Sequence, residues 1–154
     1  VLYGATSGML FAAGQAGERF CVRNSGATGV VEGCGSNGCE YMTGGSAVIL
    51  GPIGSNFGAG MTGGMAFLYD PEGDSLKNFN IETLHISRLQ PGFWSNSLLE
   101  ILKQHARETN SAIAKRLVND WLLEIENFWH VVPTEILNTL EPPLDRENIV
   151  GKIA

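Results

Sequence analysis

Residues 42–50 read Met-Thr-Gly-Gly-Ser-Ala-Val-Ile-Leu, and residues 61–69, 19 positions later, read Met-Thr-Gly-Gly-Met-Ala-Phe-Leu-Tyr. The same register takes in Asn24–Val31 one repeat earlier, and Ser7–Ala13 precedes that with an offset of 18. A period near 19, with a short apolar strand after each glycine turn, predicts a single-stranded parallel β-helix. One glycine column should form the tight corners, because glycine adopts positive φ without a steric penalty. Its members are Gly8, Gly26, Gly45 and Gly64.

Side chains alternate along a strand, so each predicted strand has two faces. We expect the interior columns to be Ala12, Val30, Ile49 and Leu68, together with Leu10, Thr28, Ala47 and Ala66. The opposite face then carries Phe11, Gly29, Val48 and Phe67, followed by Ala13, Val31, Leu50 and Tyr69. This second face is also apolar, as in parallel strands that are covered on both sides. Another part of the chain should therefore pack on it.

The composition changes near residue 70, where a turn sequence comes after the last repeat. Seventeen of the 20 glycines precede this point, which makes residues 1–70 the β-helix rungs. We assign residues 71–96 to an extended linker and residues 97–154 to an α-helical tail packed on the rungs. In that tail, Ser97 to Glu100 reads as a capping box, and Asn110-Ser111 reads as a stop and a new cap. A stripe from Ile113 to Phe128 predicts a second helix.

The composition of the chain indicates which classes of partner it can bind and in which cellular compartment it is expected. The net charge is -6 and no basic run occurs, which excludes nucleic acid as a partner. The apolar runs are too short to span a membrane. An odd number of cysteines without an export signal favours reduced thiols in the cytoplasm. The chain opens on Val1 inside a strand-like segment, so we expect a piece of a longer polypeptide. Its open first rung should make the isolated fragment a homo-oligomer.

The three cysteines, Cys21, Cys34 and Cys39, lack the four paired ligands of a structural zinc site. We expect buried structural thiols, because a free cysteine packs as a small hydrophobe. Their count alone leaves a three-cysteine iron–sulfur site open.

Two motifs invite a functional interpretation. Residues 33–38 spell G-x-G-x-x-G, but residues 39–45 are not a helix-forming sequence, so a dinucleotide site is disfavoured and glycine corners are favoured. Glu32 and Asp70 share a column two rungs apart, roughly 10 Å between backbones at the rung spacing. That lies at the far edge of an inverting glycosidase pair, and solvated corner acids are the favoured interpretation.

The chain has three scattered histidines, which are His85, His105 and His130. None of them has a Cys or Ser nucleophile nearby in a recognisable catalytic arrangement. His105 falls near an apolar helical stripe and should be a packing residue. We therefore assign no catalytic, cofactor-binding or metal-binding residue.

Two long motifs resemble the C-terminal Gly-x-Gly-x-Gly domain of the glutamate synthase large (alpha) subunit. They run from Glu32 to Gly45 and from Gly58 to Ala66. The tail is similar too, in Asp120-Trp121 and in Phe128 to Pro133. The resemblance implies a right-handed β-helix. It also implies a non-catalytic structural and interaction domain of an enzyme that converts glutamine and 2-oxoglutarate to two glutamates with reducing equivalents.

The same resemblance implies that the parent enzyme carries FMN and a [3Fe–4S] cluster outside this domain. The implied partners are the amidotransferase and FMN synthase domains of the same chain and a small reductase subunit. Two alternatives stay open. One is a fragment of a related Gly-rich subunit, as in formylmethanofuran dehydrogenase, and the other is a free-standing interaction domain.

Overall fold

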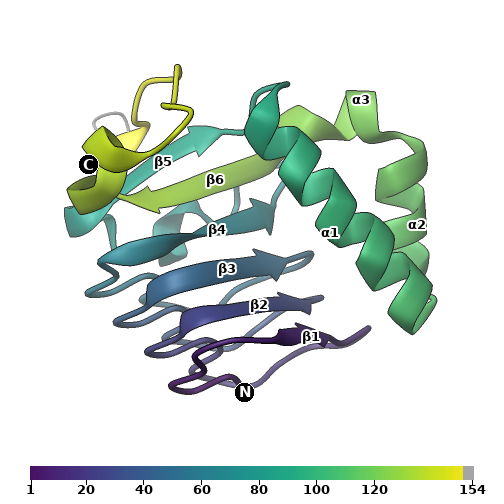
Figure 1. The fold of residues 1–154 in the computed structure, drawn as a ribbon, viewed down its shortest axis with the longest axis horizontal. Coiled ribbons are helices and arrows are strands. Elements are labelled where there is room, and N and C mark those ends of the chain that lie inside the picture. The colour runs from purple at the N-terminus through teal and green to yellow at the C-terminus, as the bar shows by residue number, and fades with distance from the viewer. Residues whose placement is uncertain (151–154) are drawn as a thin grey trace.

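A computed structural model describes residues 1–150 and shows the expected β-solenoid, with one parallel strand in each rung (Figure 1). The strands stack in sequence order and are β1 (Met9–Phe11), β2 (Ser25–Val31), β3 (Thr43–Ile49) and β4 (Gly63–Tyr69). The expectation of a mainly β chain with a repeat near 19 residues is confirmed.

Two further strands extend the same sheet beyond the last rung. β6 (Phe128–Pro133) pairs antiparallel with β4, and β5 (Leu84–Arg88) pairs antiparallel with β6. The order is β1-β2-β3-β4-β6-β5. The outer edge of β5 is covered in turn, because Ile149 N donates to Ile86 O at 2.7 Å and Asn148 Oδ1 accepts from Ile86 N. One end of the sheet is thus closed, whereas β1 lies at the open end.

Three helices come after β5 and lie against one side of the strands (Figure 1). They are α1 (Phe93–Thr109), α2 (Ala112–Asn119) and α3 (Trp121–Glu124). Short 3-10 helices occupy Leu76–Asn78, Ile81–Thr83, Ile125–Asn127 and Thr134–Thr139. None of the helices in the described residues is long and apolar enough to cross a membrane.

The helix boundaries agree with the sequence only in part. The break between α1 and α2 is as predicted, because Asn110 is left-handed at φ 58° and Ser111 Oγ accepts from Ala114 N. The start of α1 differs, since the helix begins four residues before Ser97. Ser97 Oγ donates to Phe93 O and does not cap the helix. The hydroxyl of Ser95 instead accepts from the backbone N–H of Gly92, the residue before the helix.

The predicted second helix does not reach Phe128. Its stripe is divided between α2, α3 and a 3-10 turn, and the chain then enters β6. The sequence from Phe128 to Val132 is aromatic and β-branched, which suits a strand with partners on both edges. Helical periodicity there was a coincidence of apolar spacing, and strand pairing with β4 and β5 decides the outcome.

The strands separate two apolar clusters. Inside the solenoid lie Ala47, Ala66, Ile49 and Leu68, which confirms those interior columns. On the outer face, Val48 and Phe67 pack with Leu98 and Leu102 of α1 and with Leu117 of α2. The helices therefore cover the outer apolar face of the rungs, and each buried large side chain contributes roughly 1.5–3 kcal/mol.

The predicted faces of β2 are wrong. Val30 lies in the outer cluster and Val31 in the inner one, and a Cβ on Gly29 would meet Phe20 inside the solenoid at 2.9 Å. By alternation, Thr28 shares the outer face with Val30. The strand register explains the error.

Ser25 pairs with Gly44 but Thr28 pairs with Ser46, so β2 carries one more residue than β3 over this interval. Fully buried Asn24 holds this bulge, because its side-chain amide donates to Ala27 O and accepts from Ala27 N. One inserted residue moves every later side chain to the opposite face.

Candidate functional site

The polar side chains of the rungs meet the tail at two places, and the first is Glu32. Its Oε2 lies 3.1 Å from His105 Nε2, and Ser111 Oγ donates to the same oxygen at 2.5 Å. The His105 side chain is fully buried, whereas that of Glu32 keeps 23% exposure. Glu32 thus joins the end of β2 to the junction of α1 and α2.

The second place is Asp70, at the end of β4, which is buried. Its Oδ2 accepts hydrogen bonds from Trp129 Nε1 at 2.9 Å and from Ser75 N at 3.0 Å. The guanidinium of Arg88 donates to the Asp70 carbonyl and lies 3.6 Å from the ring centre of Trp129. These contacts join β4 to β5 and β6.

The interpretation of Glu32 and Asp70 as solvated corner acids is therefore wrong. Each carboxylate accepts bonds from a different part of the tail, and a buried acceptor needs such donors because dehydration is costly. One oxygen of each carboxylate, Glu32 Oε2 and Asp70 Oδ2, bonds structural partners, and the two carboxylates share no partner. The sequence could not reveal this, since both partners lie more than 50 residues away.

Ser111, Glu32 and His105 are the residue types of a hydrolytic triad in the wrong order. The Ser111 hydroxyl and the imidazole both bond the carboxylate, and the hydroxyl also accepts from Ala114 N as a helix cap. A nucleophilic serine must instead give its proton to the histidine. His105 was expected to be a packing residue; it is buried, but its main polar contact is this carboxylate.

The three thiols are free and buried, as expected. A hydrogen bond with Cys21, together with burial, raises the pKa of Cys39 well above its usual value, and burial raises the pKa of Cys34 to about 12. Both thiols are therefore protonated near pH 7 in the metal-free fold. Among the described residues, no group of three His, Cys, Asp or Glu side chains is placed to hold a metal ion.

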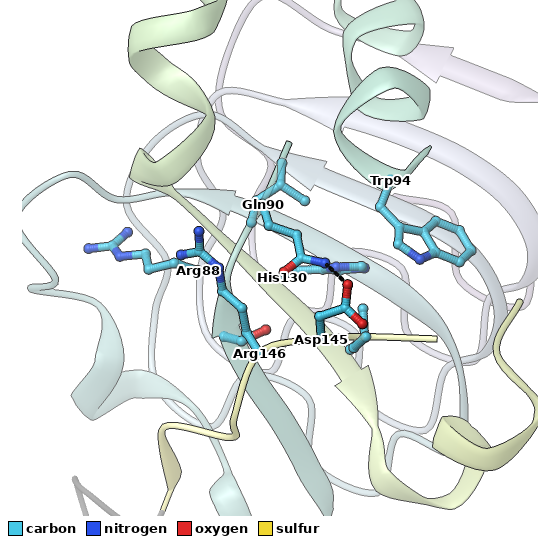
Figure 2. Close-up of a pocket in the computed structure, with 9 residues that line it drawn as sticks. Arg88, Gln90, Trp94, His130, Asp145 and Arg146 are labelled. Carbon is cyan, nitrogen blue, oxygen red and sulfur yellow. Dashed lines mark hydrogen bonds between the residues drawn. The ribbon is translucent and has the colours of Figure 1, made fainter. Parts of the chain in front are cut away.

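A small hollow lies around His130, between β5, the start of α1 and the segment 144–146 (Figure 2). Gln90 donates to Asp145 across it, and Trp94 Nε1 donates to Pro142 O beside it. The space measures about 10 Å³, close to one water molecule and too small for a substrate.

His130 itself is buried and stacks on Phe67, with ring centres 4.7 Å apart. Burial, and to a lesser degree His85, lowers its pKa to about 3. The imidazole is therefore neutral near pH 7 and a poor proton carrier there, because an efficient acid–base group has a pKa near the working pH.

The glycine-rich segment 33–38 forms turns between rungs, and the next regular element is β3 rather than a helix. It therefore lacks the helix N-terminus that binds a pyrophosphate. Of the four glycines in the predicted corner column, Gly8, Gly45 and Gly64 have positive φ. Gly26 does not; it faces the Thr6 carbonyl, where a Cβ would come within 2.2 Å. Gly26 is thus needed for close approach of two rungs rather than for a left-handed turn.

The chain is similar in sequence to one protein family and to several curated proteins of one kind. The family model described as "GXGXG motif" matches residues 1–134. The "Glutamate synthase [NADPH] large chain" of Azospirillum brasilense is 58% identical over 144 residues, which are 94% of this chain and 10% of that protein.

Two other relatives carry names with different electron donors. The "Ferredoxin-dependent glutamate synthase" of Pyropia yezoensis is 47% identical over 89% of this chain and 9% of its own length. The "Glutamate synthase [NADH]" of Schizosaccharomyces pombe is 46% identical over 91% of this chain and 7% of its own length. The chain spans about a tenth of the length of the curated relatives it matches. It belongs to the GXGXG motif family, and its homologues are glutamate synthase large chains.

Proposed function

We propose that this chain is a non-catalytic structural and interaction domain of a glutamate synthase, the enzyme that converts glutamine and 2-oxoglutarate to two glutamates with reducing equivalents. The observation that carries the proposal is the use of its polar side chains. Glu32, His105, Asp70 and Trp129 all serve to hold the tail against the rungs. Buried polar groups that bond one another across a fold add specificity to its packing.

The reacting groups then belong to other parts of the parent chain. The family resemblance assigns FMN and the [3Fe–4S] cluster to the parent enzyme, and the described residues here bring together no set of three side chains able to hold a metal ion. The domain packs against the amidotransferase and FMN synthase domains of the same polypeptide, with a small reductase subunit as a further partner. We place the parent enzyme in the cytoplasm. No observation favours the alternative of a formylmethanofuran dehydrogenase-like subunit.

The proposal is tested by purifying residues 1–154 and assaying glutaminase activity, glutamate formation and flavin content. The full-length enzyme, assayed in parallel, is the control. We expect the fragment to be colourless and inactive. A yellow fragment, or glutamine hydrolysis above the buffer background, contradicts a non-catalytic role.

A further inference from the structure

Two adjacent leucines in α3 face solvent almost completely. The residues Leu122 and Leu123 are 88% and 82% exposed, more than any other large hydrophobic residue in residues 1–150. Their neighbours Trp121 and Ile125 are four positions apart and buried in the outer cluster. Because residues i and i+4 share one helical face, Leu122 and Leu123, which follow Trp121 directly, point away from the core.

The leucines border a groove of about 420 Å³ between the helices. Half-buried Leu99 of α1 and Val118 of α2 form part of its wall. The groove is lined by seven residues: Leu99, Val118, Asn119, Asp120, Trp121, Leu122 and Leu123. Five of these seven are apolar, so the exposed leucines are part of a continuous surface rather than isolated side chains. Single exposed leucines are common, whereas a contiguous apolar groove marks a binding surface.

The charge of the groove also favours an apolar occupant. Asp120 is its single charged lining residue, and its carboxylate accepts from the neighbouring Asn119 amide at 3.2 Å. Arg116, the nearest cation in sequence, is paired with Glu124 at 2.8 Å. The residues that line the groove include no Lys, Arg or His that could bind a phosphate or an acidic peptide.

We propose that this groove, defined by Leu122, Leu123, Leu99 and Val118, binds an apolar segment of the same polypeptide that lies outside residues 1–154. The proposal rests on the proposed function in one respect, that the chain is part of a glutamate synthase large chain. The related large chains are about ten times longer than this chain, so most of the polypeptide is available as an occupant.

The size of the groove favours a tethered occupant over a separate molecule. Separate proteins that form stable complexes contribute roughly 20–30 residues a side, against the seven that line this groove. A segment of the same chain binds intramolecularly wherever its tether spans the distance, so a smaller contact suffices than between separate molecules.

Thiol labelling of the full-length enzyme tests the proposal. Leu122→Cys and, separately, Leu123→Cys place a reporter at the rim of the groove. Glu108→Cys is the matched control, because Glu108 is exposed on α1 and does not line the groove. The native thiols Cys21, Cys34 and Cys39 are buried and serve as slow internal references. Labelling by a maleimide is monitored peptide by peptide with mass spectrometry, first in native buffer and then in urea.

We expect both groove variants to label at least about ten-fold more slowly than Glu108→Cys in the native enzyme, and at the same rate in urea. Equal rates in the native enzyme overturn the proposal. Protection that disappears on dilution to a monomer, as measured by light scattering, also overturns it, because a second copy is then the occupant. Neither result bears on the non-catalytic role, which the activity and flavin assays of the isolated fragment decide separately.

Discussion

Glu32 Oε2 lies 3.1 Å from His105 Nε2, although 73 positions separate the two residues along the chain. The contact joins the second rung to the end of α1, on the side where the helices cover the strands. This polar contact fixes the position of α1 on the rungs within an otherwise apolar interface. Apolar contacts alone are non-directional and would fix that position poorly.

Removing this carboxylate should destabilise the protein. Glu32→Ala leaves the buried His105 Nε2 and the Ser111 hydroxyl without their acceptor, and an unsatisfied buried polar group costs about 1–3 kcal/mol. We expect a loss of that size in a urea unfolding curve. Glu18→Ala is the control, because Glu18 is exposed, and it should change stability by less than about 0.5 kcal/mol. Coincident curves for the two variants would show that Glu32 does not hold the tail.

Replacing Gly45 should cost more than replacing its neighbour. Gly45 has φ +81°, and a Cβ there would lie 2.3 Å from the Ala27 carbonyl oxygen. For Gly45→Val we expect a loss of roughly 1–2 kcal/mol from the left-handed backbone alone, and more from the clash. Ser46→Val, on a residue without positive φ, should cost clearly less. The comparison is made by urea unfolding, and equal losses would argue against a turn at Gly45.

Stability should fall in acid because of His130. Burial lowers the folded-state pKa of this histidine from 6.5 to about 3, so the unfolded chain binds a proton first as the pH falls. The stabilising contribution is complete above pH 6.5 and is lost progressively between pH 6.5 and 3. The slope is at most about 1.4 kcal/mol per pH unit.

The matched variant is His130→Phe, which keeps an aromatic ring against Phe67 and removes the titrating group. Unfolding free energies measured from about pH 7 to about pH 4 should decline less steeply in this variant than in the wild type. Burial lowers the pKa of His85 as well, so a residual slope is expected. Parallel profiles would mean that His130 is not the buried neutral group that the structure indicates.

The isolated fragment should self-associate through β1. This strand is at the end of the sheet order and pairs on one edge with β2, while Met9 and Tyr3 are 51% and 63% exposed nearby. Unpaired strand edges recruit other strands, and charged residues prevent this. Light scattering should show an oligomer that Met9→Lys disrupts and Leu122→Lys leaves intact. A stable monomer that binds no hydrophobic dye would show that this edge is already protected.

Local sequence was sufficient for the repeat itself. The recurrence of Met-Thr-Gly-Gly at residues 42 and 61 predicted the stacked strands, because each rung must repeat the same turn and the same apolar columns. Alternation then assigned Ile49 and Leu68 correctly to the interior. The cap at Ser111 was also readable, since a cap depends on residues within one helical turn.

Tertiary structure decided what depends on distant partners. The bulge held by Asn24 exchanges the faces of Val30 and Val31, because a single extra residue inverts a side-chain period of two. Phe128 to Pro133 becomes a strand because β4 and β5 pair with both of its edges. Asp70 is buried because Trp129, 59 positions later, donates to it. The sequence determined the repeating unit, because the turns and strands of a rung depend on residues close together in the chain. Pairing between distant segments decided the faces of β2, the strand at residues 128–133 and the burial of Asp70.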